Sequence, residues 1–179
     1  PGARDEITRD LGLLGVFDLA LFVGADSKLK SVRELISDAK ARPGKLTIGT
    51  IAVGSTQHLS AELFKSRAGV DALIVPYKGS PAVLTALSAG EIDAAFEILG
   101  PMLPQLQAKA VRALAVTSDR RFAGLPSVPT VHESGLPRYV AASWNALAVP
   151  ARTTTAVIER LHRAAHDALA LPSVRGQLQ

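Results

Sequence analysis

A segment rich in glycine and hydroxyl groups, residues 49–58, carries the strongest chemical signal in this sequence. It reads Gly-Thr-Ile-Ala-Val-Gly-Ser-Thr-Gln-His, follows a predicted strand and opens a predicted helix. Its two glycines have the spacing of the phosphate-binding loop of nucleotide hydrolases, but Ser55 stands where that loop needs lysine. Without the lysine the β- and γ-phosphates lose their main positive charge, which argues against nucleotide hydrolysis.

The same segment suits a simpler anion. Gly54 lets the backbone approach a ligand, and the free amides and positive dipole at the start of a helix favour a carboxylate. Ser55, Thr56 and Gln57 add neutral hydrogen-bond donors. The alternative is that Ser55 only caps the helix and the glycines only turn the chain, since serine is a favoured N-cap.

Histidine-based catalysis has little support. His58 could act as a base beside Ser55 or as a donor in this loop, but the Gly-x-Ser-x-Gly turn of many hydrolases is missing from the sequence. His162 and His166 are four residues apart and share a helix face, as metal ligands can. No glutamate follows His162 as in metalloproteases, and charged neighbours favour a solvated face. We therefore expect neither an enzyme nor a bound metal or cofactor.

A second candidate loop spans residues 77–81, Tyr-Lys-Gly-Ser-Pro. It again follows a predicted strand and opens a helix. Pro81 suits the first helical position and Ser80 its cap. We expect a second set of free amides here, facing the same side as the first.

Glu97 lies near the end of a third strand. A carboxylate so placed could accept a hydrogen bond from an amine or hydroxyl or hold a water, and it could equally be a solvated strand end. Because the loops at Gly54, Gly79 and Glu97 each follow a strand, they should gather at one edge of a sheet. That edge is the expected place for a small-molecule crevice.

The elements that position these loops alternate along the chain. Strands are predicted at residues 17–23, 45–50, 72–77, 92–98, 111–117 and 139–149, and helices at 32–41, 56–67, 81–88, 101–108, 130–133 and 154–171. Several strands are apolar on both faces, as buried parallel strands are. The pattern predicts an α/β fold with mainly parallel sheets flanked by helices.

Composition narrows the function classes. A chain of 179 residues with 47% apolar residues can build one domain and part of another around a real core. The absence of cysteine excludes disulfides, thiol nucleophiles and Cys-ligated metals. The net charge is +4, but scattered basic residues and only 4% aromatics make neither a basic stripe nor a stacking platform. Nucleic-acid binding is therefore disfavoured.

Many separate blocks of the sequence, in order, resemble one family. They include Gly-Ser-Thr-Gln-His-Leu at 54–59, Val-Pro-Tyr-Lys-Gly-Ser at 75–80, Gly-Glu-Ile-Asp at 90–93, Leu-Pro-Ser-Val-Pro-Thr-Val at 125–131 and Ser-Trp at 143–144. Over nearly the whole chain the sequence is similar to the Bug family, the extracytoplasmic solute receptors of tripartite tricarboxylate transporters.

The resemblance implies a type II periplasmic-binding fold, in which two α/β domains close on a small carboxylate, an organic acid or an acidic amino acid. It makes residues 1–23 a hinge strand and remnant of domain 1, residues 24–137 the complete domain 2, and residues 138–179 the return hinge strand and C-terminal helices of domain 1. It also implies that a signal peptide and the first half of domain 1 lie upstream, and hence a periplasmic location.

The resemblance also assigns ligand-binding residues. The family's carboxylate-binding loop matches Gly54, Ser55, Thr56, Gln57 and His58, and its Tyr-Lys-Gly block matches Tyr77, Lys78 and Gly79. The family pattern has aspartate where this chain has Glu97, so the longer side chain changes the amine or hydroxyl end of the pocket. Trp144 either lines the hinge side of the cleft or packs there.

The resulting hypothesis is a monomeric, non-enzymatic receptor that hands a small carboxylate to the membrane components of a tripartite tricarboxylate transporter. The main alternative is the effector-binding domain of a LysR-type transcription regulator, which shares the two-domain α/β architecture. The LysR-type reading predicts an upstream helix-turn-helix and a cytoplasmic location. An enzyme is a third possibility.

Overall fold

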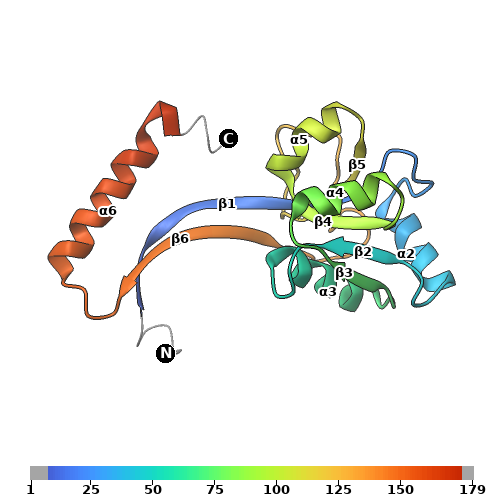
Figure 1. Ribbon diagram of the computed structural model, residues 1–179, viewed down its shortest axis with the longest axis horizontal. Coiled ribbons are helices and arrows are strands. Elements are labelled where there is room, and N and C mark those ends of the chain that lie inside the picture. Colours follow the sequence, from blue (N-terminus) through green and yellow to red (C-terminus); the bar gives the residue numbers. More distant parts are fainter. Residues whose placement is uncertain (1–7, 175–179) are drawn as a thin grey trace. The chain divides into compact units, whose positions relative to one another are not determined.

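The computed structural model describes the backbone of residues 8–174 and the side chains from residue 12 onward. Two compact units divide the chain: Phe17–Ser143 forms one, and the segments up to Val16 and from Trp144 form the other. Two strands run from one unit into the other, β1 (Thr8–Gly24) and β6 (Ala142–Pro150) (Figure 1).

The larger unit is built on a mixed sheet with strand order β3-β2-β4-β1-β5. The remaining strands are β2 (Thr47–Thr50), β3 (Leu73–Pro76), β4 (Ala94–Ile98) and β5 (Val111–Val116). β2 runs parallel to β3 and β4, and β1 is antiparallel to both β4 and β5. Four strands therefore point the same way, which confirms the predicted, mainly parallel α/β architecture, and β1 alone is reversed.

The reversed strand β1 lies between β4 and β5. Its register pairs Leu19 with Ile98 on one side and Ala20 with Val116 on the other. Leu19 through Val23 are completely buried. A strand covered on both faces needs apolar side chains in both directions, which explains this uninterrupted apolar run.

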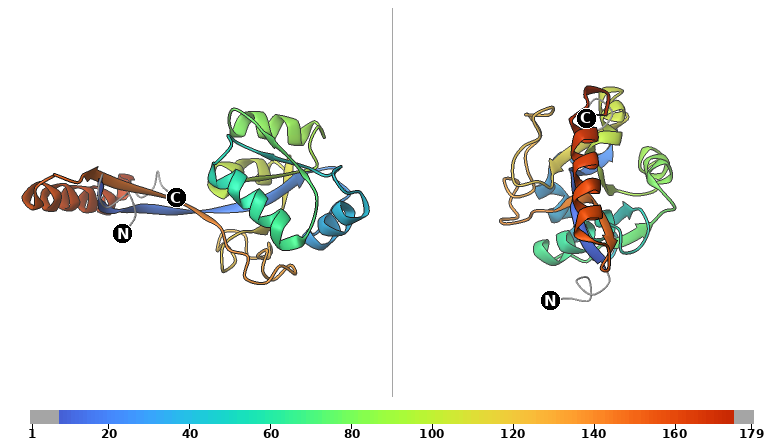
Figure 2. Two further views of the ribbon diagram at one scale, coloured as in Figure 1. Left: turned by 90° about the horizontal axis from the view of Figure 1, so that it is seen from below. Right: turned by 90° about the vertical axis from the view of Figure 1, so that its left-hand side faces the viewer.

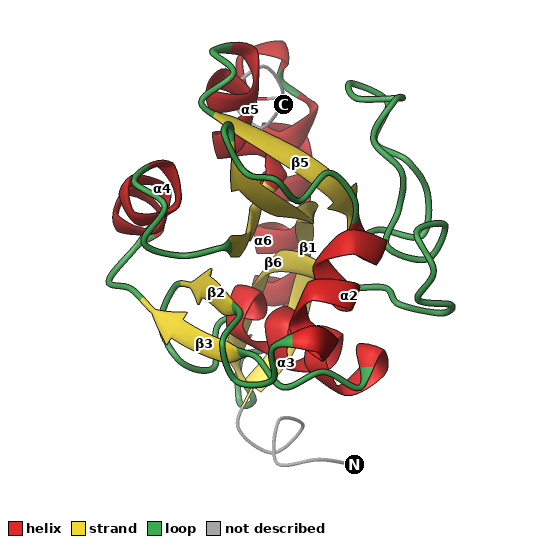
Figure 3. Ribbon diagram, turned by 90° about the vertical axis from the view of Figure 1, so that its right-hand side faces the viewer, coloured by secondary structure: helices red, strands yellow, loops and turns green. Residues whose placement is uncertain are grey.

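Helices cover both faces of the sheet. They are α2 (Val32–Ala41), α3 (Thr56–Ala68), α4 (Ser80–Ser88) and α5 (Leu99–Gln107). One core cluster joins α2 and α3 to Leu21 and Val23, and the other joins α4 and α5 to Ala20 and Phe22. Alternate residues of β1 thus enter opposite cores. Figures 2 and 3 show α4 on the opposite side of the sheet from α3.

Local signals fix the helix boundaries. Ser31 caps α2 by accepting a hydrogen bond from the Glu34 amide at 3.2 Å, and Glu34 in turn accepts from the Lys30 amide. α3 stops at Gly69, whose φ of 61° lies in the left-handed region that glycine tolerates best.

An aromatic cluster closes the core beneath α3. Phe64, Phe96 and Tyr139 have ring centroids 5.8–6.5 Å apart. Tyr139 is fully buried, and its hydroxyl donates to the Ser60 backbone oxygen at 2.8 Å. This hydrogen bond ties the loop that precedes β6 to the middle of α3.

The helix predicted at residues 130–133 is wrong. Thr130 makes an isolated bridge with Val116, and the chain then turns. Thr130 and Glu133 do form the reciprocal bonds of a capping box, since the Glu133 amide donates to the Thr130 hydroxyl and the Thr130 amide to the Glu133 carboxylate. The turn is not extended into a helix because Gly135 adopts a φ of 112° and Pro137 follows two residues later.

The smaller unit contains the first part of β1, most of β6 and the helix α6 (Thr155–Ala170). β6 pairs with β1. None of the side chains described in this unit, residues 12–16 and 144–174, is buried. Across residues 8–174, no helix is long and apolar enough to cross a membrane.

Replacing Tyr139 with phenylalanine should lower the free energy of unfolding by about 1 kcal/mol, since only the hydroxyl and its hydrogen bond are lost. Tyr139→Ala, which also leaves a cavity beside Phe64 and Phe96, should cost roughly 3–5 kcal/mol. Urea unfolding of both variants measures the difference. Equal stability of the native protein and Tyr139→Phe would show that the bond to Ser60 contributes nothing.

Candidate functional site

The first turn of α3 presents free backbone amides. Ser55 is the N-cap, and its hydroxyl oxygen accepts from the His58 amide at 3.2 Å while its backbone oxygen accepts from the Leu59 amide. The amides of Thr56 and Gln57 precede the first intrahelical bond. The cap uses only the backbone amide of His58 and leaves those of Thr56 and Gln57. Capping by Ser55 is therefore compatible with anion binding at the same helix start.

Gly54 supports this geometry. Its φ is 83°, a conformation that costs glycine little, and space beside its Cα is open. The preceding residues turn tightly, with the Ser55 amide bonded to the Ala52 backbone oxygen. A side chain at position 54 would strain the turn that aims the start of α3.

The first turn of α4 differs from its prediction. Gly79 is the N-cap, no side chain caps the helix, and Pro81 lies within the first turn. Ser80 is therefore not the cap but the first helical residue. Its hydroxyl donates instead to Glu97 at 2.9 Å. Sequence reasoning missed Ser80 as a site residue, although its place directly after the Tyr-Lys-Gly block could have indicated it.

Glu97 joins the two helix starts. Its Oε2 accepts from Ser80 Oγ at 2.9 Å and from Gln57 Nε2 at 3.3 Å. Glu97 and Gln57 are only 2% and 3% exposed, which excludes a solvated strand end for Glu97. The other oxygen, Oε1, is buried and has no hydrogen-bond partner among the described residues.

Burial raises the pKa of the Glu97 carboxyl, because removal from water disfavours the charged form. The hydrogen bonds from Ser80 and Gln57 oppose that effect in part. The charged form of Glu97 is therefore unfavourable here, and among the described residues only one of its two oxygens has hydrogen-bond donors. Such groups concentrate at functional sites.

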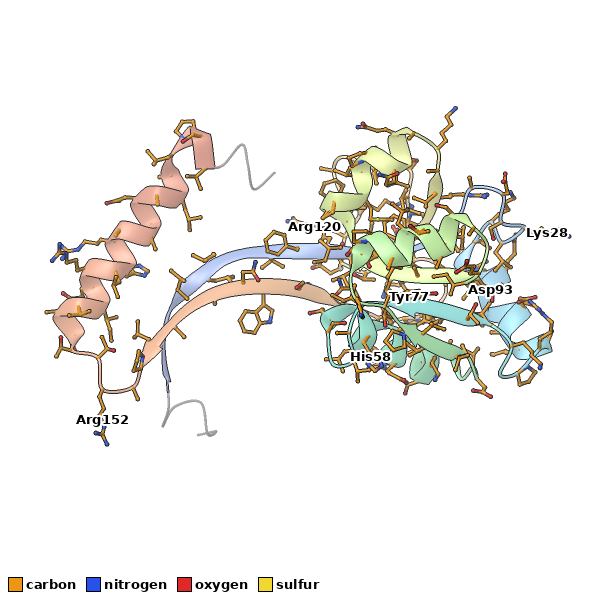
Figure 4. All side chains as sticks on the ribbon, viewed as in Figure 1. Lys28, His58, Tyr77, Asp93, Arg120 and Arg152 are labelled. Atoms are coloured by element: carbon orange, nitrogen blue, oxygen red, sulfur yellow. The ribbon has the colours of Figure 1, made fainter. Side chains whose placement is uncertain are left out.

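The other predicted residues lie around these loops. Tyr77 packs partly buried against the core and donates its amide to the Thr50 backbone oxygen at 2.8 Å, while Lys78 is exposed. Figure 4 labels His58 and Tyr77 toward one end of the larger unit, with Asp93 and Lys28 toward the other. Among the described residues, His58 Nδ1 is buried without a hydrogen-bond partner.

Ser143 lies beside the start of α3. Thr56 Oγ1 lies 3.5 Å from Ser143 Oγ, so the start of α3 meets the chain entering β6. Trp144 begins the smaller unit and is 51% exposed. Its role as a cleft residue stays a prediction.

The remaining polar groups do not form a metal centre. His162 and His166 on α6 are exposed. Within residues 8–174, no group of three or more His, Asp or Glu side chains could hold a metal ion. A cavity of about 600 Å³ lies at the opposite sheet edge, between the C-terminal ends of α2 and α4, and does not include any of the predicted binding residues.

Comparison with known proteins identifies the family. Residues 9–179 match the model of the tripartite tricarboxylate transporter family receptor. The chain belongs to this family. Among curated relatives, BugT from Bordetella pertussis is 35% identical over 172 residues, which cover 94% of this chain and 53% of BugT. The chain spans about half the length of the first curated relatives it matches.

Solved structures confirm the predicted periplasmic-binding-protein fold. R. palustris Rpa4515 with adipate is 36% identical, with a TM-score of 0.85 over 97% of this chain and 57% of that one. MatC (Rpa3494) from Rhodopseudomonas palustris with bound malate is 26% identical, with a TM-score of 0.85 over 94% of this chain and 57% of that one. Both ligands are dicarboxylates.

Stability should depend on pH through Glu97. A carboxyl whose pKa is raised in the folded state stabilises the fold when protonated, and this contribution is lost as the pH rises through the raised pKa. Relative to Glu97→Gln, which is neutral at every pH, the native protein should therefore gain unfolding free energy as the pH falls from about 8 to about 4.5. Urea unfolding across that range tests this. A difference that is constant, or that grows with pH, would contradict it.

Proposed function

We propose that this chain is the ligand-binding part of an extracytoplasmic receptor that captures a small carboxylate, an organic acid or acidic amino acid, for a tripartite tricarboxylate transporter. The observation that carries the proposal is the pair of open helix starts at one sheet edge. α3 offers two free amides and α4 has no side-chain cap. Bound adipate and malate in two related structures support the ligand class.

The carboxylate would bind at the start of α3. The amides of Thr56 and Gln57 would donate to its oxygens, the helix dipole would favour its charge, and Ser55 and His58 would shape the loop. The Tyr77, Lys78 and Gly79 loop would border the ligand from α4. Binding makes and breaks no covalent bond, and selectivity comes from hydrogen bonds that closure of a two-domain receptor buries.

The wider assignment follows from the family. Residues 24–137 would form the complete ligand-binding lobe, with residues 1–23 and 138–179 as hinge strands and parts of domain 1, and Trp144 on the hinge side. The receptor would act as a monomer in the periplasm, exported by an upstream signal peptide, and would deliver its solute to the transporter's membrane components. The family match favours this function over the LysR-type alternative.

Calorimetry of the receptor, as encoded by its native gene, tests the ligand class. Succinate, malate, adipate, aspartate and glutamate form the panel. At least one should bind with a stoichiometry of about one, as expected for a single closed crevice. No binding across the panel would refute the carboxylate assignment.

A backbone substitution tests the proposed anion site. Thr56→Pro removes the amide of residue 56, and proline is well tolerated at the first helical position after the extended Ser55. Binding should weaken about tenfold or more, since a hydrogen bond to a charged group is worth roughly 1.5–3 kcal/mol. Thr56→Val is the matched control, because it loses the hydroxyl and its contact with Ser143 but keeps the amide. Equal affinities of the two variants would contradict a role for this amide.

A further inference from the structure

The last strand of the sheet, β5, has a largely open outer edge. The strand order leaves β1 as its neighbour on one side. On the other side, within residues 8–174, its only backbone partners are Pro129 and Val131, and both bond to Val116 at the C-terminal end of the strand. The edge from Val111 to Ala115 is therefore free to pair with another segment.

The register with β1 shows which peptide groups of this edge are free. The Ala25 amide donates to the Ala110 oxygen, and antiparallel pairs alternate between hydrogen-bonded and non-hydrogen-bonded positions. Val111 and Ala113 come one and three residues after Ala110 in the same register, so they occupy non-hydrogen-bonded positions. Their N–H and C=O groups therefore point away from β1.

A groove of about 380 Å³ lies beside this free edge, where α5 packs next to β5 (Figure 3). We call it the β5 groove. Most of its lining is apolar and comes from the end of α5, from β5 and from the loop before Pro129, through Leu106, Val111, Ala113, Leu125 and Val128. Free backbone groups next to apolar side chains are what an extended segment needs in order to join a sheet.

The charges of the β5 groove all have one sign. Among the described residues, Lys109 and Arg112 are the only charged side chains that line it, and neither forms a salt bridge. Arg112 is held in place, because its Nη2 donates to the backbone oxygens of Ala25 at 2.7 Å and Ser27 at 3.3 Å. The groove therefore favours a segment that carries carboxylates.

Lys109 occupies a position where glycine would be less strained. Its φ is 56°, in the left-handed region. It follows the C-cap of α5, Ala108, and its amide donates to the Leu106 oxygen while the Ala110 amide donates to the Gln105 oxygen, as in a Schellman motif. The attraction of a lysine to a helix end is the smaller effect. A strained residue that helix termination does not require points to a function for its side chain.

Building on the proposed function, we infer that the β5 groove is the docking surface for an extended segment of the transporter's membrane components, in which acidic side chains alternate with apolar ones. The segment pairs with Val111 and Ala113 and places its carboxylates beside Lys109 and Arg112. A second copy of this chain suits the groove less well, because the chain has a net charge of +4 and would bring the same two cations to the contact.

Variants of Lys109 test the docking by biolayer interferometry, with the receptor encoded by its native gene and the membrane components in lipid nanodiscs. Lys109→Gly removes the charge and relieves the strain, so it should be as stable to urea as the native protein. It should nevertheless dock about threefold or more weakly. Lys109→Glu should dock about tenfold or more weakly, because it faces the partner's carboxylates with a like charge. Lys45→Glu makes the same change at an exposed residue outside the groove and is the matched control.

Ala113→Pro tests strand addition. Proline removes an amide that points to the open edge, and it is tolerated on an edge strand where no ladder bond depends on that amide. Docking should weaken about fivefold or more, because one hydrogen bond to the partner is lost. Ala113→Ser keeps the amide and should dock like the native receptor. Equal docking of the two variants would overturn strand addition, and if Ala113→Pro does not fold, the Lys109 variants decide.

Replacing Lys109 with the photo-crosslinking amino acid p-benzoylphenylalanine identifies the occupant in the same nanodiscs. Crosslinks should map to an acidic, extended segment of a membrane component. Crosslinks to a second receptor, to lipid or to nothing would overturn the inference, as would unchanged docking of both Lys109 variants.

Calorimetry with the carboxylate panel separates this inference from the proposed function. The β5 groove contains none of the predicted solute-binding residues, so every variant should bind solute as the native receptor does. If solute binds and docking does not depend on the groove, only the docking inference fails. If the native receptor binds no member of the panel, the proposed function itself fails.

Discussion

The insertion of β1 between β4 and β5 is the constraint on which the larger unit depends. Leu19 through Val23 are completely buried and supply side chains to both cores. Glu97 lies on β4 and pairs with Ala20 of β1. The pairing with β1 therefore also fixes the position of Glu97 in the sheet. Thr117 reinforces the arrangement, since its amide donates to the Leu19 oxygen and its hydroxyl to the Ala141 oxygen. Thr117 thereby joins β1 to the residue just before β6.

Glu97 links the starts of α3 and α4, two elements that are separate in the sequence. One oxygen of its carboxylate, Oε2, accepts hydrogen bonds from both helices. Ser80 and Gln57 link α4 and α3 to the same atom, so the two amide-bearing turns keep a fixed separation.

Much of the fold was predictable because local signals agreed with one another. Strong apolar runs and the serine cap at Ser55 both act within one or two turns. The prediction of a helix at residues 130–133 was wrong because it also relied on local signals alone. Thr130 and Glu133 carry a capping-box pattern and form its bonds, but Gly135 and the bridge to Val116 turn the chain away from a helix.

The sequence by itself determined the alternation of strands and helices, the two helix starts and their gathering at one sheet edge, since these follow from periodicity, capping and the direction of parallel strands. Only the tertiary structure decided that β1 runs antiparallel between β4 and β5, that Ser80 donates to Glu97 instead of capping α4, and that Glu97 is buried. These features depend on contacts between residues that are far apart in the chain. The separation is 17 positions for Ser80 and Glu97 and 98 positions for Leu19 and Thr117. No local sequence pattern specifies such contacts.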